Sequence, residues 1–276
     1  MKLFKRKIKP NDFLEEDLPS SRPELFWDIM KNEFRKLFFV SGVLIVFALP
    51  FLAMHVFLDY ELIAMESQGA SSNWPHYVFL IANPFLTAIF GIGIAGSLRI
   101  IKRLCYMDPV FLWDDFKKGV KQNARQCVLF SFLIGLFFSI CYLFRVNNPS
   151  SFVNNIPLGI FALIVFPCLM FAYPVIGTYT TKVSETFSLS CRLYPKAFLT
   201  NLIPLVAFLS VYFFELIPDL VLKYALILLF LLLISPLMLL GFFLYSSYLF
   251  DKFINKEKYP ELVNRGIRRK KEKEED

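Results

Sequence analysis

The chain has 276 residues, of which 56% are hydrophobic and 19% are charged. Soluble domains are usually about 45–50% apolar and about 25% charged, so this composition excludes an ordinary soluble globular domain. The net charge is +7, but the basic residues flank apolar blocks and form no patch interleaved with exposed aromatic residues, so no nucleic acid partner is expected.

Residues 1–36 precede the first long apolar run and predict a cytoplasmic extension that carries an interfacial helix. No apolar segment follows the basic start within these residues, so a cleavable signal peptide is not expected. Ser21, followed three residues later by Glu24, fits a capping box that covers the free amides at a helix start. The helix that follows is expected to lie on the membrane surface through one apolar stripe, made of Phe26, Met30, Phe34 and Leu37.

Six apolar runs follow, each longer than the roughly 17 residues that a helix needs to cross the hydrocarbon core of a bilayer. They predict an all-α, polytopic membrane protein whose domain at 37–250 has six transmembrane helices in contact with the lipid bilayer. The last two runs are separated by only three residues, 218–220, which fits a helical hairpin most simply and leaves a re-entrant pair open. The runs cover residues 37–58, 77–101, 127–144, 156–177, 198–217 and 221–250.

Lysines and arginines alternate in number between these runs. Residues 1–36 hold nine, 99–126 seven, 178–197 three and 251–276 nine, whereas the segments between them hold none, one and one. Positive residues favour the cytoplasmic side of a membrane, and only an even number of spans preserves this alternation. We therefore expect both termini in the cytoplasm, with a charged cytoplasmic tail at 251–276.

Prolines and glycines punctuate several spans. Asn83 and Pro84 fall early in the second run, and Tyr173 and Pro174 fall late in the fourth. Because proline removes a backbone hydrogen bond and kinks a helix, these residues mark either close packing, together with the glycines of the second run, or a solute path at broken helices. No charged residue lies near the centre of a span, which argues against a proton-coupled transporter or pump acting alone.

The segment after the second run is amphipathic and opens with Asp108 and Pro109, which favour a helix start. It fits a helix at the membrane interface with a tryptophan at headgroup level. It also fits a docking helix that inserts its aromatic residues into a groove of a partner protein. The residues expected to make such a contact are Phe111, Trp113, Asp115, Phe116, Lys121 and Arg125.

No group of residues predicts a catalytic centre, a cofactor or a metal site. The five cysteines form no CxxC pair and fit small buried hydrophobic residues better than disulfides or metal ligands. His55 and His76 flank one external loop, and ordinary interfacial histidines fit them better than a metal site, which would need a third ligand from Asp59, Glu61 or Glu66. No nucleophile–base motif lies within a span, so we expect no enzyme.

Two sets of short motifs resemble the YesL-like family of bacterial membrane proteins. One set lies at residues 84–88, 99–103 and 113–123, and the other at 173–174, 186–194 and 201–204. The resemblance covers about residues 37–250. It implies a bacterial inner membrane protein of unassigned activity, from a family often encoded beside carbohydrate uptake transporters and polysaccharide-degrading enzymes. It carries over no catalytic residues.

Together, these features predict a non-enzymatic membrane protein that is an accessory or component subunit of ABC-type carbohydrate uptake. Its expected partners are a transporter permease or ATPase subunit, and a homo-oligomer stays open. One alternative is a stand-alone permease for a neutral solute, with Trp113, Tyr173 and Tyr179 stacking on sugar rings. A second alternative is a purely structural membrane assembly factor.

Overall fold

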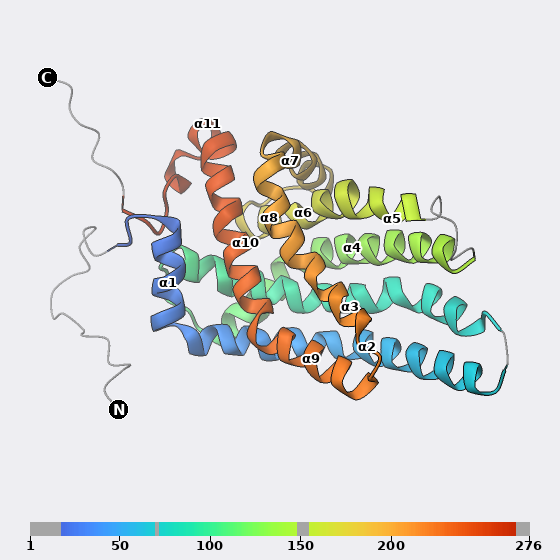
Figure 1. The fold of residues 1–276 in the computed structure, drawn as a ribbon. Helices are drawn as coiled ribbons and strands as arrows, with labels where there is room; N and C mark the ends of the chain where they lie inside the picture. Colours follow the sequence, from blue (N-terminus) through green and yellow to red (C-terminus); the bar gives the residue numbers. More distant parts are fainter. Residues whose placement is uncertain (1–17, 70–71, 148–154, 269–276) are drawn as a thin grey trace, which may run out of the picture.

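The computed structural model describes residues 18–69, 72–147 and 155–268, and within these ranges the chain is helical and contains no strand (Figure 1). Five helices there are long and apolar enough to cross a membrane. The predicted all-α membrane fold is therefore confirmed. Most of the predicted N-terminal extension, at 1–17, and the end of the charged tail, at 269–276, lie outside the described residues.

The first helix, α1 (Arg22–Asn32), begins at the predicted cap. The Ser21 hydroxyl accepts a hydrogen bond from the Glu24 amide at 3.4 Å, whereas the Glu24 carboxylate accepts from the amide and hydroxyl of Ser20. These hydrogen bonds from Ser20 hold the pKa of Glu24 below its usual value. Leu25 and Ile29 are the residues that α1 buries, so its inward face lies beside the predicted stripe. The helix crosses the ends of the longer helices (Figure 1).

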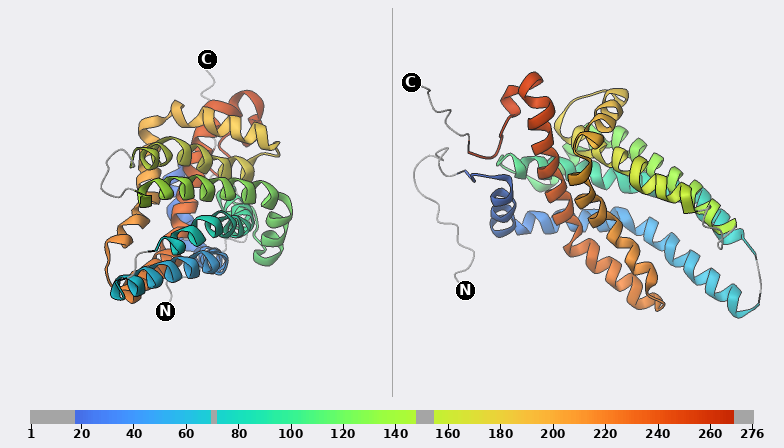
Figure 2. Two further views of the ribbon diagram at one scale, coloured as in Figure 1. Left: turned by 90° about the vertical axis from the view of Figure 1, so that its right-hand side faces the viewer. Right: turned by 45° about the horizontal axis from the view of Figure 1, so that its top comes forward.

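Four long helical segments run side by side along the long axis of the molecule and match the first four predicted spans (Figures 1 and 2). The segments are α2 (Phe34–Ser67), α3 (Trp74–Cys105), α4 (Leu112–Asn147) and a composite of α5 (Ile156–Ile160), the π-helical η3 (Phe161–Val165) and α6 (Phe166–Thr178). With 34 residues in α2 and 36 in α4, both extend roughly 50 Å, well beyond a hydrocarbon core of about 30 Å. Accordingly, α2 continues through much of the loop that the sequence predicts at 59–76.

The last two predicted spans differ from the structure. The fifth is a short helix, α8 (Phe198–Leu209), continued by the 3₁₀ segment η4 (Ser210–Leu216), and it follows the amphipathic α7 (Val183–Lys196). The sixth is not one helix, because α9 (Leu220–Leu233) ends before Ser235-Pro236 and α10 (Ser235–Phe250) starts in a new direction across the long helices (Figure 1). The predicted hairpin is present, since the Phe214 and Phe230 rings of η4 and α9 lie 5.7 Å apart.

Both described ends of the chain lie at the same end of the bundle. The Arg268 amide donates to the Pro19 carbonyl at 2.8 Å, and Arg265 pairs with Asp108 at 3.3 Å. Between α10 and this contact, the chain forms η5 (Asp251–Asn255), α11 (Lys256–Lys258) and η6 (Pro260–Leu262). The start of the predicted tail therefore packs on the protein.

The α3–α4 interface is close because glycines stand where larger residues do not fit. A Cβ on Gly96 would lie 2.1 Å from the Phe116 ring, and a Cβ on Gly91 would lie 2.6 Å from the Ser131 hydroxyl. On the other side of the interface, a Cβ on Gly135 would meet Thr87 Oγ1 at 2.0 Å. The packing interpretation of these glycines is therefore confirmed for the second span, since small residues let helix backbones approach.

We expect Gly96→Ala to lower the stability of the folded protein by about 1–3 kcal/mol, because the added methyl group overpacks the α3–α4 interface. Thermal unfolding in mild detergent measures this change. Gly42→Ala is the matched control, because a Cβ at Gly42 in α2 meets nothing within 4 Å. A melting temperature for Gly96→Ala equal to that of Gly42→Ala would contradict the interface described above.

Candidate functional site

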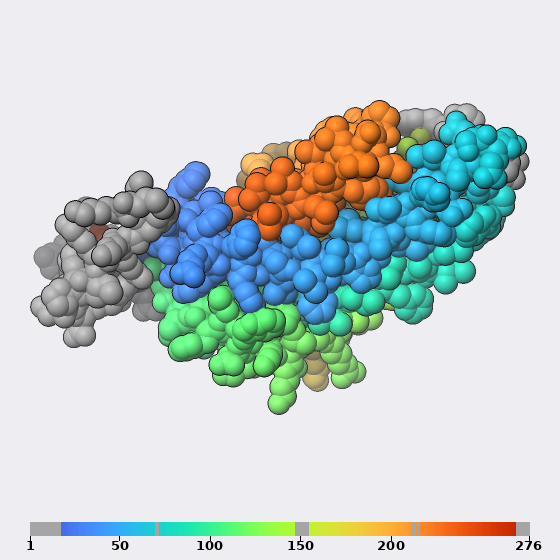
Figure 3. Space-filling view, turned by 90° about the horizontal axis from the view of Figure 1, so that it is seen from below, coloured from blue at the N-terminus to red at the C-terminus, as the bar shows by residue number. Residues whose placement is uncertain are grey.

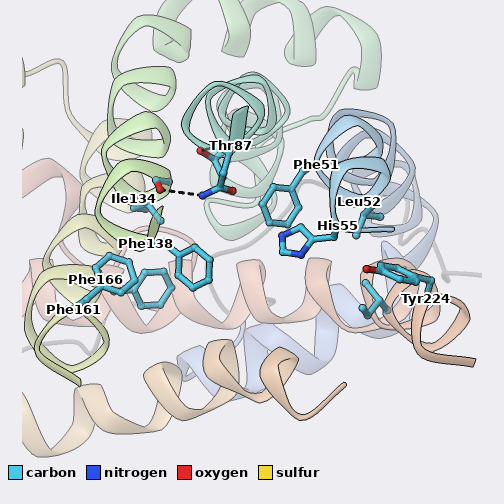
Figure 4. Close-up of a pocket in the computed structure, with 12 residues that line it drawn as sticks. Phe51, Leu52, His55, Thr87, Ile134, Phe138, Phe161, Phe166 and Tyr224 are labelled. Carbon is cyan, nitrogen blue, oxygen red and sulfur yellow. Dashed lines mark hydrogen bonds between the residues drawn. The ribbon is translucent and has the colours of Figure 1, made fainter. Parts of the chain in front are cut away.

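A cavity of about 210 Å³ lies among α2, α3, α4, the composite fourth segment and α9 (Figure 4). Four phenylalanines from three of these elements, together with leucine and isoleucine side chains, form the apolar part of its lining. Four polar residues interrupt this apolar lining: His55 of α2, Asn83 and Thr87 of α3, and Tyr224 of α9. An apolar pocket with a few convergent polar groups is the usual form of a small-molecule site.

Asn83 is the polar residue of this cavity with unused hydrogen-bonding capacity. Asn83 is only 1% exposed. Its Nδ2 donates to the Gly135 carbonyl at 3.0 Å and to the Ser139 hydroxyl at 2.9 Å. Its Oδ1 is buried and accepts no hydrogen bond from any residue that the structure describes. A buried acceptor without a donor costs about 1–3 kcal/mol, so Asn83 is an unsatisfied polar group beside the cavity.

The four residues predicted to mark broken helices are not brought together. Asn83 lines the cavity, but α3 continues through Pro84 without interruption, so the expected break at this point is absent. Tyr173 and Pro174 lie within α6 and do not line the cavity, and the Tyr173 hydroxyl is instead 2.8 Å from the Ser131 hydroxyl. The irregular part of the fourth segment is η3, which contributes Phe161 to the cavity wall.

A buried ion pair beside the cavity is the main feature that the sequence analysis missed. Lys223 is 4% exposed and its Nζ lies 2.7 Å from Asp59 Oδ2, which also accepts from the Tyr224 hydroxyl at 2.9 Å. By sequence Asp59 is expected in an external loop, whereas α2 continues past it and faces α9. The signal available in the sequence is one acidic and one basic residue at the edges of two apolar runs.

This pair yields a stability prediction. Asp59→Leu removes the Asp59 carboxylate from the buried Lys223 ammonium, so we expect a loss of about 3 kcal/mol. The double variant Asp59→Leu with Lys223→Leu removes both charges and is expected to recover most of that loss, because an apolar pair carries no desolvation cost. Thermal unfolding of both variants in detergent measures the difference, and an equal loss in both would rule out the pairing.

A second candidate region lies at the amino end of α4, where Asp115 is 1% exposed. Its Oδ1 accepts from Arg99 Nε at 3.2 Å, and its Oδ2 accepts from Arg103 Nη1 at 2.9 Å and from the Phe111 amide at 2.8 Å. Asp115 therefore joins α3 to the first turn of α4 and satisfies an amide that no helical carbonyl reaches.

The amphipathic segment is part of α4. The predicted helix start at Asp108 and Pro109 is wrong, because α4 begins at Leu112 and continues without a break into the third span. The separate interfacial helix expected here is therefore absent. Asp108 instead pairs with Arg265 of the C-terminal segment.

The six residues predicted for docking divide into two sets. Phe111 and Trp113 are 64% and 61% exposed, and Lys121 and Arg125 are also exposed. Asp115 is buried, as is Phe116, which packs against Gly96. Phe111 immediately precedes α4, and Trp113, Lys121 and Arg125 lie in the first half of that helix. Atoms coloured green, the colour of this part of the chain, protrude at the lower edge of Figure 3.

The two histidines make separate contacts. The His55 ring packs between the Phe51 and Phe79 rings at 4.5 and 4.9 Å, whereas His76 Nδ1 is 2.8 Å from the Tyr142 hydroxyl. Among the described residues, no three histidine, cysteine or acidic side chains gather where they could hold a metal ion. The five cysteines carry free thiols.

Comparison of the chain with models of protein families, with curated proteins and with solved structures finds no match. The resemblance to the YesL-like family, and the activity and partners that it implies, therefore stay predictions.

Proposed function

We propose that this protein is a non-enzymatic accessory subunit of a membrane transporter and that the projecting end of α4 binds the partner. The observation that carries this proposal is the exposure of Phe111 and Trp113 on a helix end that Asp115 attaches to α3. Exposed aromatic residues on a rigid helix lose little conformational freedom on binding, and aromatic residues dominate the energy of protein interfaces.

The chemistry of this end favours a partner with an apolar groove and an acidic rim. Lys117, Lys118, Lys121 and Arg125 surround the two aromatic residues along the same helix and are exposed or partly exposed. A groove that accepts the aromatic residues of a helix, bordered by carboxylates, complements this surface.

The positive charge of this end supports a cytoplasmic location, and the sequence resemblance supports the inner membrane of a bacterium and a role in ABC-type carbohydrate uptake. The proposed partner is accordingly a permease or ATPase subunit of such a transporter. Both chain termini then lie in the cytoplasm.

The proposal is tested by purification from native membranes in mild detergent at native expression. We expect the wild-type protein to bring down transporter subunits and the double variant Phe111→Ala with Trp113→Ala to recover at least tenfold less of them, because two anchor residues are lost. Trp74→Ala is the control, since Trp74 is exposed at the opposite end of the bundle. Equal recovery with the double variant would contradict the proposal.

A second candidate function is transport or binding of a small neutral solute in the cavity. The observation that favours it is Asn83, a residue that lines the apolar cavity and whose buried Oδ1 receives no donor from the described residues. Such an acceptor suits one hydroxyl group of a solute whose remaining surface contacts phenylalanine rings.

Uptake of labelled monosaccharides into vesicles containing the purified protein tests this candidate. Asn83→Leu is expected to abolish uptake because it removes the acceptor. Ser139→Ala is expected to retain uptake because it removes only a partner of the Asn83 amide nitrogen. The absence of uptake by wild-type vesicles, or uptake that survives Asn83→Leu, would exclude the solute role.

A further inference from the structure

A groove of about 1010 Å³ lies between α1 and the end of α10, away from the cavity of Figure 4. Both helices cross the same end of the long bundle, at the left of Figure 1. Its lining includes Phe26 and Trp27 of α1, Gly241 and Leu244 of α10, and Lys256 of α11. The groove thus combines an apolar floor with a basic rim.

Arg22 is one of the charged residues that line this groove, and its side chain is 10% exposed. Its Nη2 donates to Asp251 Oδ2 at 2.5 Å, whereas its Nη1 is buried and donates to no residue that the structure describes. A guanidinium carries five N–H donors in a planar fork that suits phosphate. Arg22 lines the groove and places a permanent positive charge there.

Asp251 accepts hydrogen bonds from two other residues in addition to Arg22. Its Oδ1 accepts from Asn255 Nδ2 at 2.7 Å, and its Oδ2 accepts from the Asn264 amide at 3.2 Å in addition to Arg22. Of the charged residues that line the groove, Asp251 is the one acidic residue, against Arg22, Lys252 and Lys256. The described lining is thus net positive.

The other part of the groove suits a hydrocarbon chain. Gly241 leaves the wall of α10 open, since a Cβ there would meet no atom closer than Phe26 Cε2 at 3.8 Å. Trp27 and Tyr248 are 68% and 52% exposed beside it. Tryptophan and tyrosine side chains with one apolar and one polar part favour the level of lipid headgroups.

We propose that this groove binds one anionic phospholipid, with its phosphate at Arg22 and one acyl chain along Gly241 and Leu244. The net positive lining, with its arginine and two lysines, and the apolar floor match the two halves of such a lipid. This site is independent of the function proposed for α4.

The test uses the full-length protein in nanodiscs of equal parts phosphatidylglycerol and phosphatidylcholine, followed by native mass spectrometry in mild detergent. The wild-type protein is expected to retain one phosphatidylglycerol in preference to phosphatidylcholine. Arg22→Gln is expected to reduce this preference about tenfold, equivalent to about 1.4 kcal/mol. Arg35→Gln is the matched control, because Arg35 is exposed at the same end and does not line the groove.

Gly241→Leu provides a variant that keeps every charge, since it fills the groove with a side chain that favours helix formation. We expect this variant to melt at the wild-type temperature and to lose the retained lipid. Retention of phosphatidylglycerol by Gly241→Leu, equal retention of both lipids by the wild type, or displacement of the lipid by millimolar inorganic phosphate would each overturn the proposal.

A photo-crosslinking amino acid in place of Trp27 identifies the occupant directly. The expected adduct has the mass of phosphatidylglycerol. An adduct to another part of this chain or to a second copy of it would instead show that protein occupies the groove, and would overturn the lipid assignment.

Discussion

The Asp115 carboxylate accepts hydrogen bonds from two arginines of α3 and from the backbone of its own helix start. A buried carboxylate is stable only where several donors compensate for the water it has lost. Because these donors belong to α3 and α4, the interaction fixes where α4 begins and how it lies against its neighbour. Asp115 thus holds the backbone at Phe111, and the Trp113 ring packs edge-on against Phe39 of α2, with ring centroids 5.3 Å apart.

The close contact of α3 and α4 continues from this point through the membrane. Gly96 receives the Phe116 ring near Asp115, and Gly135 allows Asn83 to reach a backbone carbonyl farther along. The same interface therefore positions both candidate sites, the amino end of α4 and the cavity that Asn83 lines. Polar side chains at such interfaces form hydrogen bonds between helices. Asn83 does so through Nδ2, whereas its Oδ1 accepts no hydrogen bond from the described residues.

The sequence predicts the parts of this structure that depend on local pattern. Long apolar runs yield the first four spans, and Ser21 marks the start of α1 because capping depends on neighbours in the chain. The sequence does not reveal which side of an amphipathic helix faces inward when its neighbour is also amphipathic. Asp115 and Phe116 were for this reason grouped with exposed residues, although they are buried against α3.

The remaining differences arise from contacts between distant segments. The run at 221–250 is apolar throughout, and hydropathy alone does not register the change of direction at Ser235. Asp59 and Lys223 are 164 positions apart in the sequence. Neither the end of α2 nor the burial of Lys223 can therefore be inferred from the residues next to it in the chain. Pro84 fits either close packing or a broken helix by sequence, and α3 continues through it because neighbouring helices satisfy the backbone groups that a proline frees.

The central claim is that Asp115 holds the first turns of α4 as a fixed extension of a membrane helix. Hydrogen–deuterium exchange of residues 112–126, in the wild-type protein and in Asp115→Leu, tests it most directly. The account predicts strong protection of these amides in the wild type and a loss of roughly a hundredfold in the variant, the scale expected for breaking a buried ion pair. Exchange of these amides at the rate of an unfolded peptide in the wild type, or protection unchanged in the variant, would contradict it.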